Sequence, residues 1–168
     1  RSCAMAFNRM VDFKYDRLNP RTQAWALPSS RVNLWQYGFF LAITLAIFMF
    51  ACYSLTYLAF YLAPLAIAII FFYSFTKRFT CWSHLFLGLA LGIAPVGAWI
   101  GIKEEISLEA LLLSGAVLLW VAGFDTLYAC QDVIFDRKQG LYSWPARYGI
   151  AESLVFARWL HIGMIILL

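Results

Sequence analysis

All five aspartates of the chain lie in two short segments, one near residue 14 and one near residue 130. In the first segment Asp12 and Asp16 are four residues apart, and in the second Asp132 and Asp136 repeat that step. Asp125 precedes the second pair by two helical turns. Matched carboxylate pairs in a chain that is otherwise apolar indicate a shared chemical task.

Residues four apart on a helix lie on one face, with Cβ atoms about 5–6 Å apart. Two carboxylates at that spacing repel each other unless a cation lies between them. Oxygen ligands without His or Cys favour a hard ion, above all Mg²⁺, which binds one or two carboxylates together with substrate phosphates. Two facing clusters suit two ions that hold one diphosphate. The predicted metal ligands are Asn8, Asp12, Asp16, Asp125, Asp132 and Asp136, and the four paired aspartates are the predicted catalytic residues.

Basic residues near both clusters are candidates for a phosphate cradle. They are Arg21, Lys77, Arg78, Arg137 and Lys138. A simpler interpretation is that the aspartates face water or pair with these neighbouring Arg and Lys residues. The identical four-residue spacing of the two pairs favours a metal and diphosphate site over this simpler interpretation.

Asp125 and Arg1 are expected deeper in the membrane than the paired aspartates, where a charge is costly and usually functional. Asp125 could hold a metal-bound water, orient Tyr128 or Arg1, or pair with Arg9. Arg1 could be the structural partner of Asp125 or could hold an anionic acceptor group, so Arg1 and Tyr128 are the candidate contacts for an aromatic substrate. The two histidines, His84 and His161, are interpreted as packing or interface residues.

Composition identifies the elements that position these residues. Of 168 residues 63% are hydrophobic and 13% charged, with a mean hydropathy of +0.74, far more apolar than a soluble domain. Basic residues are divided among short loops, which excludes a nucleic-acid patch. The four cysteines have no CxxC spacing and are expected to be isolated apolar fillers. The sequence predicts an all-α, polytopic transmembrane bundle in a lipid bilayer.

Five apolar runs are long enough to cross, or begin to cross, about 30 Å of hydrocarbon. They cover about residues 34–53, 57–75, 82–102 and 108–128, and, after a loop expected over residues 139–149, a last run from residue 151. A further helix is expected over residues 1–16, ended by Asn19-Pro20. Pro64 should kink its helix without ending it, and Ser107 should cap the fourth run. The pairs Gly88/Gly92 and Gly97/Gly101 are candidate close-packing motifs.

The charge distribution predicts topology. On one side the links at residues 54–56 and 103–107 carry a single basic residue, Lys103, whereas the connections on the other side carry nine. Positive loops stay in the cytoplasm. Both aspartate clusters are therefore expected to open on the cytoplasmic face of a cell inner membrane.

Two spaced motifs resemble the UbiA superfamily of intramembrane aromatic prenyltransferases. The first is Arg1-x6-Asn8-x3-Asp12-x3-Asp16, followed by Asn19-Pro20-Arg21-Thr22. The second is Asp125-x2-Tyr128-Ala129-x2-Asp132-x3-Asp136-x3-Gly140-Leu141-x-Ser143. The segment Ser143-Trp-Pro-Ala-Arg-Tyr-Gly149 is similar to the 4-hydroxybenzoate polyprenyltransferase branch, which includes the related enzyme of the futalosine menaquinone route.

The resemblance implies that residues 1–168 form one domain, a fragment holding helices two to part of seven of a nine-helix bundle. It implies Mg²⁺-dependent transfer of a polyprenyl group from its diphosphate to an aromatic acid, most simply 4-hydroxybenzoate, in ubiquinone or menaquinone biosynthesis. Arg21 and Lys77 would stabilise the departing diphosphate. This chain departs from the family pattern twice: many members have Asp where Arg9 stands, and the branch commonly has Arg in the segment where Trp25 stands.

Two other classes use acidic residues in membranes. A cation-coupled transporter would place acids near the midplane with access from both faces, whereas these clusters are expected at one face. A CDP-alcohol phosphotransferase needs the motif D-x2-D-G-x2-A-R, which the sequence lacks.

Overall fold

The computed structural model describes every residue from Arg1 to Leu168. It is entirely helical, with nine α-helices and one 3₁₀ turn. In chain order these are α1 (Ser2–Val11), α2 (Phe13–Leu18), α3 (Leu34–Leu55), α4 (Tyr57–Thr76), α5 (Ser83–Lys103), α6 (Leu108–Ala129), the 3₁₀ turn η1 (Cys130–Asp132), α7 (Val133–Gln139), α8 (Trp144–Tyr148) and α9 (Ile150–Leu167).

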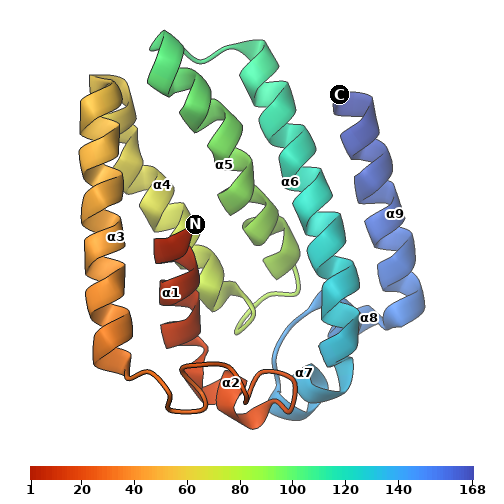
Figure 1. Cartoon of the computed structure of the whole chain (residues 1–168). Helices are drawn as coiled ribbons and strands as arrows, with labels where there is room; N and C mark the ends of the chain where they lie inside the picture. The colour runs from red at the N-terminus through yellow and green to blue at the C-terminus, as the bar shows by residue number, and fades with distance from the viewer.

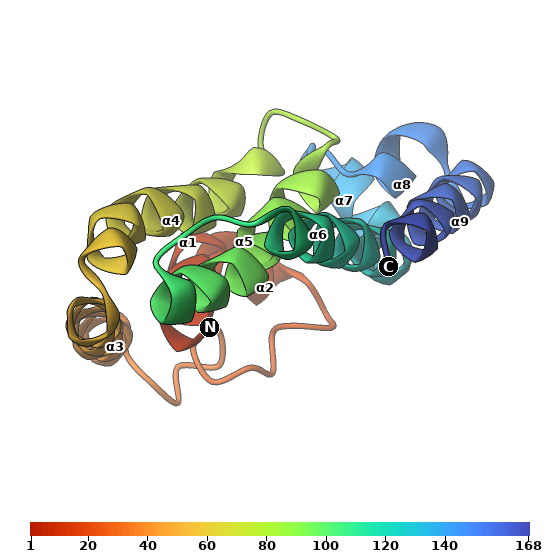
Figure 2. The same ribbon diagram turned by 90° about the horizontal axis from the view of Figure 1, so that it is seen from above.

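The long helices stand side by side in a curved row (Figures 1 and 2). Along the row α3 contacts α4, α4 contacts α5, α5 contacts α6, and α6 contacts α9. Helix α1 packs against both α3 and α4, where Phe7 stacks on Phe71 with ring centroids 3.9 Å apart. The short helices α2, α7 and α8 gather at one end of the row (Figure 1). The fold therefore brings the first and the last third of the chain together at that end.

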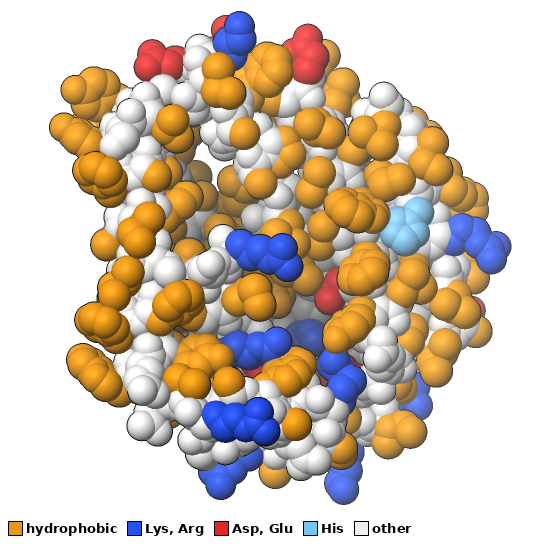
Figure 3. Space-filling view, in the orientation of Figure 1, with side chains coloured by type: hydrophobic (Ala, Val, Ile, Leu, Met, Phe, Trp, Pro, Cys, Tyr) orange, Lys and Arg blue, Asp and Glu red, His pale blue; other side chains and the backbone are white.

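Five helices are long and apolar enough to cross a membrane. Only 30 of the 168 residues are buried, so most large apolar side chains lie on the outside. Figure 3 shows hydrophobic side chains over most of the visible face, with Lys and Arg concentrated towards the end that carries α2 and α7. A surface this apolar needs lipid or further helices around it. The predicted polytopic helical bundle is confirmed.

Three of the spanning helices, α3, α4 and α6, begin at polar residues whose side chains satisfy free backbone groups. At α3 the Gln36 side chain accepts a hydrogen bond of 2.8 Å from the Asn33 backbone N–H. The Thr56 hydroxyl accepts one of 3.0 Å at the start of α4, and the Ser107 hydroxyl accepts one of 3.2 Å at the start of α6. Ser107 is thus the cap that the sequence predicts, and Pro64 lies inside α4 as expected.

Only one of the two glycine motifs is a close-packing motif. A Cβ at Gly88 would collide with the Leu118 carbonyl group of α6, and one at Gly92 would lie 2.9 Å from the Ser114 carbonyl oxygen. A Cβ at Gly97 would meet nothing within 4 Å, and one at Gly101 only a Leu55 methyl group at 3.3 Å. The prediction for Gly97/Gly101 is therefore wrong, because that end of α5 does not lie against another backbone.

Two predicted boundaries also differ. The helix expected over residues 1–16 is interrupted at Asp12, whose φ of −90° and ψ of 4° separate α1 from α2. The connection after Gln139, expected as a loop, contains α8, because the Ser143 hydroxyl caps it by accepting a hydrogen bond from the Ala146 N–H at 3.3 Å.

Candidate active site

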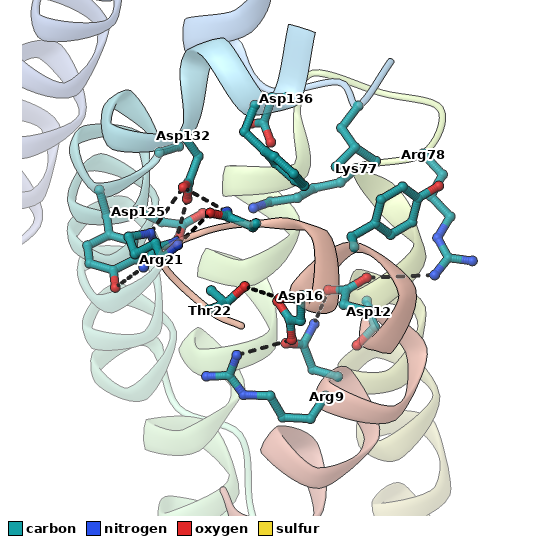
Figure 4. A pocket seen from close by; sticks show the side chains of 18 of the residues that line it. Arg9, Asp12, Asp16, Arg21, Thr22, Lys77, Arg78, Asp125, Asp132 and Asp136 are labelled. Atoms are coloured by element: carbon teal, nitrogen blue, oxygen red, sulfur yellow. Dashed lines mark hydrogen bonds and ion pairs between the residues drawn. The ribbon is translucent and has the colours of Figure 1, made fainter. Parts of the chain in front are cut away.

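Both aspartate clusters line one cavity of about 190 Å³ at the end where α2 and α7 lie. Its walls come from α1, α2, the connection after α2, the end of α4, and the segment from α6 to α7 (Figure 4). Five aspartates and four basic side chains line it, namely Asp12, Asp16, Asp125, Asp132, Asp136, Arg9, Arg21, Lys77 and Arg78. The cavity is small and highly charged, in contrast to the apolar outer surface.

The first cluster stays aligned across the interruption at Asp12. The Asp12 N–H donates to the Asn8 carbonyl and the Asp16 N–H to the Asp12 carbonyl, each at 2.8 Å. The Asn8 amide donates to the Asp12 carboxylate at 3.1 Å. Arg78 lies 3.6 Å from Asp12, and Arg9 lies 3.4 Å from Asp16. Burial raises the pKa of both Asp12 and Asp16 above the ordinary aspartate value, despite these cations.

The second cluster is held by the connection that follows α2. The Asn19 amide donates to the buried Asp132 carboxylate at 3.1 Å, and Arg21 donates to both of its oxygens, from Nε at 3.0 Å and from Nη2. Arg21 Nη1 also donates to the Tyr128 hydroxyl at 2.6 Å. One turn further, Asp136 is buried and accepts a hydrogen bond of 2.8 Å from the Ser143 hydroxyl. Residues 19–21 thus join the two clusters.

Lys77 lies between the clusters at the end of α4 (Figure 4). Burial alone would lower the pKa of its ammonium group, but the carboxylates of Asp125 and Asp136 outweigh burial and the pKa is raised. None of the hydrogen bonds or ion pairs of the structure uses this ammonium group. An ammonium group with unused N–H donors can bind an anion, and the surrounding carboxylates can bind the metal cations that accompany that anion.

The donor set suits a metal site that a phosphorylated ligand completes. No three side chains of His, Cys, Asp or Glu converge closely enough to form an all-protein metal cage. The cavity instead offers carboxylate and amide oxygens in two separate groups, with basic side chains between them. Mg²⁺ prefers such sites, in which one or two carboxylates and substrate phosphates complete its octahedron. The residues therefore fit Mg²⁺ that binds together with a phosphorylated ligand.

Comparison with known proteins identifies the family. The chain matches the UbiA prenyltransferase family over residues 1–168. The chain belongs to the UbiA prenyltransferase family. Among curated relatives, the 4-hydroxybenzoate octaprenyltransferase of Marinobacter nauticus is 32% identical over 94% of this chain and 54% of its own length. That of Legionella pneumophila strain Lens is 31% identical over 94% of this chain and 56% of its own. The chain thus spans about half the length of these relatives.

Solved structures agree with the UbiA fold. A UbiA homologue from Aeropyrum pernix K1 superposes with a TM-score of 0.93 at 37% identity, over 99% of this chain and 64% of that one. A digeranylgeranylglyceryl phosphate synthase superposes with a TM-score of 0.70 at 22% identity, over 98% of this chain and 58% of that one, and supports the fold alone.

Three of the residues predicted to bind substrate lie outside the cavity of this UbiA family member. Arg1 is exposed and does not line it. Arg137 Nε donates to the Ala146 carbonyl at 2.8 Å, so its guanidinium group holds α8. Lys138 is exposed and borders a separate groove beside Arg21. None of these three cations lines the cavity, whereas Arg21, Lys77 and Tyr128 do.

His84 is the residue whose role the sequence did not reveal. It is buried at the start of α5, and its Nδ1 lies 2.6 Å from the Asp125 carboxylate of α6. The Trp144 N–H donates to His84 Nε2 at 3.3 Å, so the proton must be on Nδ1 and the ring donates to Asp125. Asp125 therefore pairs with His84 and not with Arg1 or Arg9. Only the three-dimensional neighbourhood, not sequence spacing, relates these residues.

Proposed function

We propose that the whole protein is an intramembrane prenyltransferase that transfers a polyprenyl group from its diphosphate to an aromatic acid. The observation that carries this proposal is the single cavity in which two matched aspartate clusters face each other with Lys77 between them. The two curated relatives named above are 4-hydroxybenzoate octaprenyltransferases, which makes 4-hydroxybenzoate the first acceptor to test, for ubiquinone or menaquinone synthesis.

The cluster residues would hold Mg²⁺, through Asn8, Asp12 and Asp16 on one side and Asp132 and Asp136 on the other. Bound there, Mg²⁺ supplies positive charge that neutralises the leaving diphosphate. Asp125 would add a further carboxylate to the second cluster, and the His84 ring, 2.6 Å away, orients that carboxylate. This division of labour needs no all-protein metal cage, which agrees with the separation of the two clusters.

Lys77 and Arg21 would bind the diphosphate oxygens. As the allylic carbon–oxygen bond breaks, negative charge accumulates on the leaving group, and fixed cations in a small cavity stabilise it most at that point. The allylic carbocation then forms a carbon–carbon bond with the ring carbon ortho to the phenol, and that carbon loses its proton to a cluster carboxylate or to water. Tyr128, whose hydroxyl is held by Arg21, lies where it can orient the aromatic ring.

The cavity opens at the end of the bundle where the basic connections lie, and we place that end on the cytoplasmic side of the cell inner membrane. The links at Thr56 and at Glu104–Ser107 lie at the opposite end (Figure 1). A water-soluble acid and a membrane-anchored diphosphate can then meet at one face.

The decisive experiment uses the full-length protein in membranes, with a radiolabelled polyprenyl diphosphate and a panel of aromatic acids. Transfer should require Mg²⁺ and release one diphosphate per prenylated product. Asp12→Asn and Asp132→Asn should each abolish transfer, while Glu104→Gln, an acid at the opposite end of the bundle, should leave it unchanged. Wild-type-like turnover in both aspartate variants would refute the proposal.

A further inference from the structure

Two side chains of the cavity wall, Arg9 and Trp25, contact each other. The guanidinium carbon of Arg9, on α1, lies 3.3 Å from the centroid of the Trp25 ring, in the connection between α2 and α3. Both side chains line the cavity. A guanidinium group that stacks by its face keeps its five N–H donors available at the edge.

Those donors are almost unused. The only hydrogen bond of Arg9 runs from Nη1 to the Asp16 carboxylate at 3.4 Å, near the outer limit for such a bond. The side chain is 27% exposed, so it is neither buried in a fixed network nor free in water. Arg9 is therefore anchored by its face and only loosely held at its edge.

The other two arginines of the cavity are more firmly committed. Arg21 donates to Asp132 from two nitrogens and to Tyr128 from a third. Arg78 donates to the Val11 carbonyl at 2.8 Å and pairs with Asp12. Arg9 is thus the arginine that can change partner most easily, by moving its edge while its face stays on the tryptophan.

We propose that Arg9 is a further diphosphate-binding residue, which pairs with Asp16 until that carboxylate takes a divalent cation and then donates to the diphosphate. This inference rests on the proposed function and adds a residue to it. Before the substrate arrives, Arg9 offsets the negative charge of the first cluster. Once Asp16 binds the metal ion, the released N–H groups of Arg9 gain a strong acceptor in the phosphate oxygens.

The exchange predicts two effects of opposite sign. A divalent cation alone must displace Arg9 from Asp16 without offering it a new partner, so Arg9 weakens metal binding in the absence of diphosphate. When diphosphate is present, Arg9 gains contacts and strengthens the complex. Metal and diphosphate therefore favour each other's binding, and linkage requires the effect to be reciprocal.

The test measures binding and needs no turnover. Full-length protein in detergent is titrated with Mn²⁺ alone and, at saturating Mn²⁺, with inorganic pyrophosphate, both by calorimetry. Arg9→Gln should bind Mn²⁺ alone about fivefold or more tightly than wild type, and should bind pyrophosphate about fivefold or more weakly. Arg17→Gln, the same substitution at an exposed α2 residue outside the cavity, should change neither affinity.

Other outcomes separate the alternatives. If Arg9→Gln weakens both affinities, or changes neither, Arg9 has a structural role only and the inference is wrong. If the glutamine variant does not fold, Arg9→Lys provides the test, because it keeps the charge but loses the planar stack. The affinity of Arg9→Lys for Mn²⁺ alone should stay near that of wild type, while its affinity for pyrophosphate should be weaker. Any other result overturns the inference. If wild type binds no pyrophosphate in the presence of Mn²⁺, the proposed function itself fails.

Discussion

Replacing His84 by Ala should destabilise the bundle strongly, because two buried groups lose their partner at once. The Asp125 carboxylate loses its 2.6 Å bond, and the Trp144 N–H loses its acceptor at 3.3 Å. A buried polar group left without its hydrogen-bond partner costs about 1–3 kcal/mol, and more when it is charged. Since the Asp125 side chain is 20% exposed, water can partly replace the imidazole, and we expect about 3 kcal/mol for the two groups together.

Thermal unfolding of the full-length protein in detergent measures this loss. The shift in Tm per kcal/mol becomes smaller as a protein becomes larger, so Tm of the full-length protein should fall by several degrees. His161→Ala is the matched control, because His161 Nε2 is buried without a hydrogen-bond partner. Its substitution removes packing but no hydrogen bond, and should lower Tm less.

The double variant His84→Ala/Asp125→Asn completes the cycle. Removing the carboxylate charge eliminates the most costly unpaired group, so the double variant should be more stable than the sum of the single changes predicts. Strict additivity, or equal Tm shifts for the two histidine variants, would show that the His84–Asp125 contact contributes nothing and would refute this reasoning.

Three further predictions concern packing, ligand affinity and pH. Gly88→Val should separate α5 from α6 and lower Tm, whereas Gly97→Val, where a Cβ has open space, should change it little; equal shifts would contradict the packing. Arg21→Ala should raise the KM for the polyprenyl diphosphate about tenfold, equivalent to one charge-assisted hydrogen bond, and an unchanged KM would exclude diphosphate contact. Because burial raises the pKa of Asp12 and Asp16, both carboxylates take up protons at a higher pH than ordinary aspartates. As pH falls at subsaturating Mg²⁺, kcat/KM should therefore decline at a higher pH than ordinary aspartates would give, and saturating Mg²⁺ should move the decline to lower pH; a decline that does not respond to Mg²⁺ would argue against these two residues.

The sequence alone predicts the membrane class and the spans well, because both depend on long apolar runs and on caps such as Ser107 that act locally. It also places both aspartate clusters at one end, because the number of spans between them fixes which side each cluster reaches. It does not predict the interruption at Asp12, where the backbone departs from helical angles although the residue type and spacing fit a continuous helix. The first cluster still has helical spacing, because the backbone hydrogen bonds from Asp12 to Asn8 and from Asp16 to Asp12 are both formed, each at 2.8 Å.

Side-chain partners are harder to predict, since they depend on angles between helices. Arg137 and Lys138 follow Asp136 directly, yet the turn of α7 directs Arg137 towards α8 and leaves Lys138 exposed. His84 looks isolated in the sequence, and only the packing of α5 on α6 brings it to Asp125. Charge alone cannot tell which of several cations near a site will enter it.

The bonds from residues 19–21 to Asp132 have a consequence for this membrane protein when the thickness of the bilayer changes. Asn19 follows Asp16 by three residues and donates to Asp132 at 3.1 Å, so a short peptide sets the separation of the two acidic groups. Helices tilt when the hydrocarbon thickness changes, which would shift residues carried on different helices relative to each other. A tether between the groups limits that shift, so catalysis should tolerate lipids of different chain length even where the tilt of α6 follows them.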